Sequence, residues 1–173
     1  RKRDFIIMNK TTKVILNALV FVAWFAMFSM LISTVAYFGS FCVDIVHISK
    51  QGLSQNTGFA LFSSFINLIT SILLIFIYNC LRKFSNSVKK NSFFNAYNII
   101  QLKSFLIYTG SYLAIELVFL FVSGIHEQYP FGPALGNALL SIALPTVFWA
   151  FSYLVYVAFK YGFNLQEDFD DVI

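Results

Sequence analysis

Charged residues, cysteine and proline are all scarce in this sequence. Only 12% of its 173 residues are charged, and it contains two cysteines and three prolines. A water-soluble domain typically carries about 25% charged residues, so the chain lacks the surface that such a domain needs. Two cysteines are also too few for a disulfide-rich secreted fold.

Sequence motifs of the common catalytic sites are missing as well. There is no Gly-x-Ser-x-Gly, no His-Glu-x-x-His and no phosphate-binding glycine-rich loop. Cys42 and Cys80 are expected near opposite ends of membrane spans, too far apart for a disulfide or for shared metal chemistry. We therefore expect no enzyme activity and no cofactor.

Long hydrophobic runs dominate the sequence instead. Hydrophobic residues make up 58% of the chain, and 22 residues are Phe. Four runs are each long enough to cross a hydrocarbon core about 30 Å thick. Because lipid offers the backbone no hydrogen-bond partners, each run is expected to be a helix. The predicted spans cover about 14–41, 57–80, 99–123 and 137–160, within a single transmembrane domain over 1–173.

The distribution of lysine and arginine predicts the orientation of these spans. Eleven of the twelve basic residues lie at one end of the predicted spans, and Lys50 alone lies at the other. By the positive-inside rule, both termini, the loop 81–98 and the tail 161–173 are cytoplasmic. The predicted fold class is therefore all-α, a four-transmembrane-helix bundle with both termini cytoplasmic. Membrane lipid is an expected partner and nucleic acid is not, because no basic module lies outside the membrane.

Polar residues recur at helical spacing inside three of the spans. Membrane helices associate through small and polar residues, so these stripes predict the inner faces of one compact bundle. A polar transport path is the alternative interpretation. Pro145 removes a helical hydrogen bond and is expected to kink the fourth span. The stripes are Ala60, Ser63, Ser64, Asn67, Thr70 and Ser71; Ser104, Tyr108, Tyr112 and Glu116; and Asn137, Ser141, Pro145, Ser152 and Tyr156.

Glu116 is the acidic residue that lies well inside a span. A carboxylate at that depth is costly, so its presence calls for a structural or functional reason. One interpretation is a buried hydrogen bond to Asn or Ser on a neighbouring helix; the other is ligand or proton sensing. Glu116, Asn67, Ser63 and Tyr112 are the predicted intramembrane polar residues.

Four residues of the outer loops have the chemistry of metal ligands. Asp44 and His47 are three residues apart, and His126 and Glu127 are adjacent. If the two loops met, their nitrogen and oxygen atoms would suit a divalent ion. Ordinary solvated loop residues are the alternative, because the ligand spacing is not tight.

The cytoplasmic segments carry opposite charges. Arg82, Lys83, Lys89 and Lys90 make the middle loop basic, and we expect the second helix to extend beyond the membrane before the chain turns near residues 91–95. The tail can fold back on this loop, bind a basic partner protein or be disordered, as the ends of chains often are. Gly162 is expected to loosen the helix at the membrane exit. The residues predicted for partner binding are Leu165, Glu167, Asp168, Phe169, Asp170 and Asp171.

The tail contains Leu165-Gln166-Glu167-Asp168-x-Asp170, and the middle loop contains Phe93 or Phe94, then Asn95 and Leu102-Lys103. These stretches resemble the tail and middle loop of the DUF2975 family of small bacterial membrane proteins. The chain departs from the family pattern at Ser92, where proline is usual, and at Asp171-Val172. The resemblance implies a four-span protein that senses a signal and modulates a small helix-turn-helix regulator.

These observations lead to three functional hypotheses. The first is a non-enzymatic sensory or regulatory membrane protein that acts on a cytoplasmic partner through its acidic tail and basic loop. The second is an immunity or resistance protein against a membrane-active toxin. The third is a small transporter or channel subunit with Glu116 on the path. Homo-oligomerisation is left open by all three.

Overall fold

The computed structural model describes residues 10–90 and 94–170, without the side chains of 10, 51 and 167–170. Over these residues the chain forms four α-helices, and all four are long and apolar enough to cross a membrane. They are α1 (Lys10–Gln51), α2 (Gln55–Lys89), α3 (Ala96–His126) and α4 (Phe131–Asp170). The prediction of four helices, each long and apolar enough to span a membrane, is therefore confirmed for the described residues.

Every predicted span lies inside a longer helix, and one local prediction was wrong. The segment 132–136, which contains two glycines, belongs to the first turns of α4. Gly162 does not loosen α4, which continues without interruption to Asp170. Most of the predicted loop 81–98 is also helical, because α2 continues to Lys89 and α3 begins at Ala96.

The helices begin and end at residues that satisfy free backbone groups. Ser54 caps α2 in a capping box with Thr57, and the Asn95 side chain caps α3 by accepting the backbone N–H of Asn98 at 2.7 Å. After α1, Gly52 adopts a φ of 83°, a left-handed conformation in which glycine has no steric cost. The α1–α2 and α3–α4 connections are correspondingly short.

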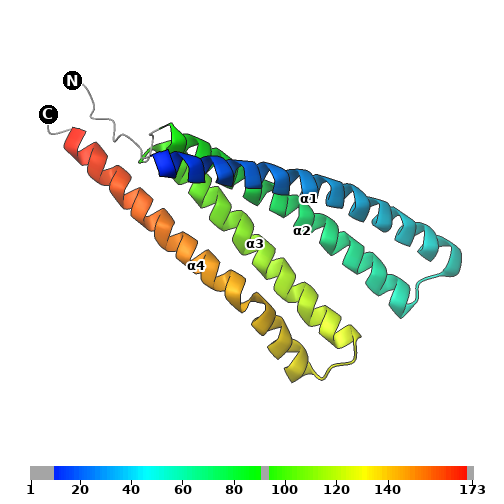
Figure 1. Cartoon of the computed structure of the whole chain (residues 1–173). Helices are drawn as coiled ribbons and strands as arrows, with labels where there is room; N and C mark the ends of the chain where they lie inside the picture. Colours follow the sequence, from blue (N-terminus) through cyan, green and yellow to red (C-terminus); the bar gives the residue numbers. More distant parts are fainter. Residues whose placement is uncertain (1–9, 91–93, 171–173) are drawn as a thin grey trace.

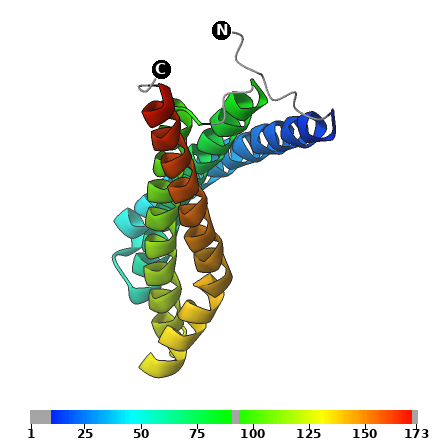
Figure 2. The same ribbon diagram turned by 90° about the vertical axis from the view of Figure 1, so that its left-hand side faces the viewer.

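The four helices are arranged as an open row. Only consecutive helices, α1 with α2, α2 with α3, and α3 with α4, have their backbones close together among the described residues. Figure 1 shows both termini at one end of the molecule and the two short hairpin connections at the other. Figure 2 shows the α1–α2 hairpin crossing the α3–α4 hairpin at an angle. The arrangement is more open than the compact bundle that the polar stripes predicted.

Large apolar side chains cover the outside of the row. Phe21 on α1 is 72% exposed and Leu140 on α4 is 77% exposed, and many of their apolar neighbours are more than half exposed. Apolar surface this extensive is costly in water and suits the hydrocarbon core of a bilayer. The chain is thus a multi-pass membrane protein. We call the end with the termini the terminal end and the opposite end the hairpin end.

Candidate functional site

Hydroxyl groups join α1 to α2 along their contact. Thr34 donates to Ser71 Oγ at 2.9 Å, and the hydroxyls of Ser40 and Ser64 lie 3.3 Å apart. Ser64 also donates to a carboxylate oxygen of Asp44 at 2.6 Å. Thr34 and Ser40 were missed by the sequence reasoning, which looked for polar stripes only on the other three spans. Small polar residues at helical spacing on the first span, the criterion applied to the other three spans, could have identified them.

The polar stripe predicted on the second span lies partly in this contact. Ser64, Thr70 and Ser71 are buried. Ser63 and Asn67 are half-buried, and the Asn67 amide donates to Ser63 Oγ within α2 at 3.5 Å. Ser63 and Asn67 therefore interact with each other, and no described residue of another helix accepts a hydrogen bond from them.

Glu116 is half-buried on α3 and makes no hydrogen bond to any described residue. The hydrogen bond to Asn or Ser on a neighbouring helix, one of the two interpretations given for Glu116, is therefore not formed with the described residues. Tyr112, one helical turn earlier, is also half-buried. The stripe on α3 meets α2 through aromatic contact instead, since Tyr108 stacks on Phe76 with ring centroids 5.3 Å apart.

The predicted stripe on the fourth span does not form an inner face. Asn137, Ser141 and Pro145 are exposed, and the Ser141 hydroxyl donates to the Asn137 carbonyl of its own helix at 2.9 Å. A serine that bonds its own backbone needs no neighbouring helix. Ser152 and Tyr156 are half-buried.

Small residues and one tryptophan make the contact between α3 and α4. Ala134 and Ala138 are each 1% exposed. Ala134 packs so closely on α3 that a Cβ placed on Gly124 would lie 3.0 Å from its methyl group. Trp149 donates its indole N–H to the Leu106 carbonyl at 2.9 Å. This contact follows the rule that small residues let membrane helices approach closely.

The four predicted metal ligands at the hairpin end do not come together. Asp44 is engaged by Ser64, and the His126 ring stacks on Phe59 of α2 with centroids 3.9 Å apart. Across the described part of the chain, no cluster of three or more His, Cys, Asp or Glu residues could hold a metal ion. Glu127 is exposed just after α3.

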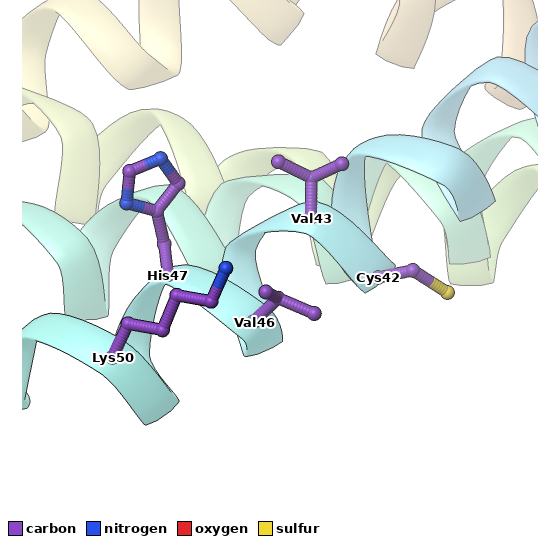
Figure 3. A pocket seen from close by; sticks show the side chains of 5 residues that line it. All are labelled: Cys42, Val43, Val46, His47 and Lys50. Atoms are coloured by element: carbon purple, nitrogen blue, oxygen red, sulfur yellow. The ribbon is translucent and has the colours of Figure 1, made fainter.

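His47 lines a shallow depression of about 410 Å³ on α1, seen in Figure 3. All five lining residues come from this helix, and in the figure Cys42 lies at one end of this row of side chains while His47 and Lys50 lie at the other. These side chains offer one thiol, one imidazole and one ammonium, with no carboxylate. The lining residues are Cys42, Val43, Val46, His47 and Lys50.

Aromatic side chains join three helices at the terminal end. Phe159 of α4 contacts Phe84 of α2 edge to face and also Phe94 just before α3, both with ring centroids 5.4 Å apart. Phe84 in turn packs on the buried pair Leu16 and Val88, which brings in α1. The terminal end is therefore where all four helices are linked through side chains.

Gly162 permits this arrangement by lying directly against Phe94. A Cβ at position 162 would lie 2.6 Å from a ring carbon of Phe94, closer than side chains normally approach. Its role is thus close packing rather than the helix loosening that we predicted. The part of α4 that follows Gly162 therefore extends beyond this contact between α4 and Phe94.

The four basic residues of the middle segment separate into different environments. Arg82 turns toward α1, with its guanidinium carbon 4.4 Å from the centre of the Trp24 ring and Nη2 donating to Asn79 at 2.8 Å. Lys83 and Lys90 line a depression of about 360 Å³ between the end of α2 and the start of α3. Lys89 is exposed and lies outside that lining.

The predicted partner-binding tail is partly described. Leu165 is 41% exposed on the last turns of α4. The backbone of Glu167, Asp168, Phe169 and Asp170 is helical, while Asp171 lies outside the described residues. Comparison with protein-family models, curated proteins and solved structures gives no significant match to this chain.

Proposed function

We propose that the chain is a non-enzymatic regulatory protein of the bacterial inner membrane that binds a cytoplasmic protein through the end of α4. In this proposal both termini are cytoplasmic, as the lysine and arginine distribution predicts. The partner has a basic surface, and a small helix-turn-helix regulator fits the resemblance to the DUF2975 family. The four membrane helices serve as the scaffold that presents the binding segment.

The observation that carries the proposal is the uninterrupted course of α4. The helix continues from Lys160 to Asp170, which is about 15 Å at 1.5 Å per residue. Its base is fixed by the contact of Gly162 with Phe94 and by the aromatic pair of Phe94 and Phe159. A helix held in this way presents its side chains in a fixed order, so less entropy is lost on binding than with a flexible tail.

The composition of this segment defines the partner. The tail 161–173 contains four acids and no base, so it favours a basic surface and repels an acidic one. Exposed charges attract weakly and are screened within about 8 Å at physiological salt, so charge alone gives little affinity. Leu165 and Phe169 are one turn apart on the helix and add apolar surface, worth about 1.5–3 kcal/mol each when fully buried.

The test uses a photo-crosslinking amino acid at position 164 of the full chain in its native membrane. Cytoplasmic proteins crosslinked to this position are recovered and identified by mass spectrometry. We compare the parent with a variant in which Glu167, Asp168, Asp170 and Asp171 become Gln or Asn. A Gln166→Pro variant keeps every acid but breaks the helix, because proline removes a backbone donor and clashes with the preceding turn. Gln166→Ala is the matched control.

The proposal expects one protein to be recovered with the parent and with Gln166→Ala, and to be lost from both other variants. Recovery should also fall with salt for the parent. Equal recovery from all four chains would exclude the end of α4 as the binding segment. If the crosslinked protein is lost from the variant without the acids but is still recovered with Gln166→Pro, binding depends on charge and does not depend on helical presentation.

A further inference from the structure

A basic depression lies at the terminal end, between the last turns of α2 and the first turn of α3. Its volume is about 360 Å³, within the range of about 300–1,000 Å³ that is usual for sites of small ligands. None of its lining residues comes from α1 or α4. The lining residues are Lys83, Asn86, Ser87, Lys90, Asn95 and Tyr97.

The positive charge of this depression is not neutralised by the described part of the chain. Neither Lys83 nor Lys90 forms an ion pair with a described residue, and no carboxylate is among the lining side chains. Lys83 and Lys90 are seven residues apart, which is two helical turns, so they lie on the same side of α2.

Uncharged hydrogen-bond donors lie between and opposite the two lysines. Asn86 is exposed and offers its amide, and Tyr97 on α3 is 46% exposed and offers its hydroxyl. Ser87 is held in place by Asn95, whose amide donates to its hydroxyl at 3.5 Å. Two cations with amide and hydroxyl donors form a lining that suits the several acceptor oxygens of a phosphate group.

The part of the depression at Lys83 lies level with the headgroup region of a bilayer. The apolar part of α2 ends at Leu81, so Lys83 lies about 3 Å beyond it and Lys90 about 13.5 Å beyond it at 1.5 Å per residue. The polar region on each side of a bilayer is roughly 5–7 Å thick. A lipid phosphate therefore lies level with the lower part of the depression, where Lys83 is.

We propose that this depression binds the phosphate group of an anionic phospholipid headgroup. Lys83 and Lys90 pair with the phosphate oxygens, while Asn86 and Tyr97 donate hydrogen bonds to the same group. The lipid would then bridge α2 and α3 at the point where the chain turns between them. This site does not depend on the partner-binding role proposed for α4.

The experiment measures lipid binding by the full chain in neutral detergent micelles, where no charged membrane surface is present. Binding of phosphatidylglycerol and of phosphatidylcholine is followed by native mass spectrometry as lipid is titrated. The test variant is the double substitution Lys83→Gln with Lys90→Gln. The matched control is Lys89→Gln with Lys103→Gln. It also removes two positive charges, but from exposed lysines of α2 and α3 that do not line the depression.

The proposal expects phosphatidylglycerol to bind the parent more tightly than phosphatidylcholine. The test variant should weaken that binding at least about tenfold, the scale of losing one hydrogen bond to a charged group. The matched control should change it less than about threefold. Equal weakening by both double variants would overturn the proposal, since only general charge attraction would remain. No weakening by the test variant would overturn it as well.

Two further arms identify the source of the anion. Inorganic phosphate is added as a competitor: displacement of phosphatidylglycerol would support a phosphate site that also takes the free ion, and no displacement would support a lipid site. A chain ending at Gln166 tests the acids of the tail as internal competitors. If phosphatidylglycerol binds only to this shortened chain, the tail occupies the depression and the lipid proposal fails for the full protein.

Discussion

Replacing Gly124 by Ala tests how α3 and α4 are held together. A Cβ at this position would lie 3.0 Å from the Ala134 methyl carbon and 3.3 Å from the Ala134 Cα. The second of these atoms belongs to the backbone, so it cannot move aside as the tip of a flexible side chain can. Gly136 is the matched control, because a Cβ there meets nothing within 4 Å.

The two substitutions should change the free energy of unfolding in opposite directions. Adding a methyl group to a tight contact costs about 1–3 kcal/mol, whereas replacing Gly by Ala within a helix gains about 0.5–1 kcal/mol. We expect Gly124→Ala to lower the free energy of unfolding by up to about 2.5 kcal/mol and Gly136→Ala to raise it by about 0.5–1 kcal/mol. Combining Gly124→Ala with Ala134→Gly removes the nearest contact and should restore part of the loss.

The assay is reversible unfolding of the purified protein in mixed micelles, followed by circular dichroism as the fraction of denaturing detergent increases. The far-ultraviolet spectrum before unfolding checks that each variant keeps its helices. If Gly124→Ala and Gly136→Ala shift the midpoint by the same amount in the same direction, α3 and α4 do not depend on the close approach at Gly124. Absence of any rescue by Ala134→Gly would contradict the assignment of the clash to that pair.

Two further predictions concern Glu116 and the orientation of the chain. Because Glu116 makes no hydrogen bond to a described residue, Glu116→Gln and Glu116→Leu should be at least as stable as the parent in the same assay, and a loss of about 1 kcal/mol or more would reveal a partner. For orientation, Cys42 is exposed and should react with a membrane-impermeant maleimide added to intact cells, whereas a Cys-free chain carrying Asn86→Cys should react only after permeabilisation. Cys80 is 6% exposed and should stay unlabelled in the parent chain with or without permeabilisation. If position 86 reacted in intact cells and Cys42 reacted only after permeabilisation, the topology would be inverted.

Much of the architecture follows from the sequence alone. Runs of more than 20 apolar residues must be helical in lipid because each backbone group needs a partner within its own segment, and this requires no knowledge of the neighbours. The helix starts at Gln55 and Ala96 are equally local, since Ser54 and Asn95 satisfy the first free N–H groups with their own side chains. The lysine and arginine distribution likewise predicts an orientation without a structure.

The faces through which the helices meet were decided by the tertiary structure. Helical spacing identifies which residues share a face, but it does not say whether that face meets a neighbour or lipid. A serine satisfied by its own backbone is tolerated in either place. Ser141 and Ser71 therefore look alike in the sequence, although Ser141 is exposed on α4 and Ser71 accepts a hydrogen bond from Thr34 on α1.

The same limit applies to the glycines and the basic residues. Gly162 has the local chemistry of a helix breaker, yet it lies within α4, and the Phe94 ring occupies the space that a side chain at this position would need. Arg82 and Lys83 are neighbours in sequence and differ in environment because consecutive positions on a helix point about 100° apart. Arg82 thereby reaches Trp24 on α1, while Lys83 lines the depression beside α3. Sequence provides the residue types and their order along each helix, and only the packing of one helix against another determines which of them meet.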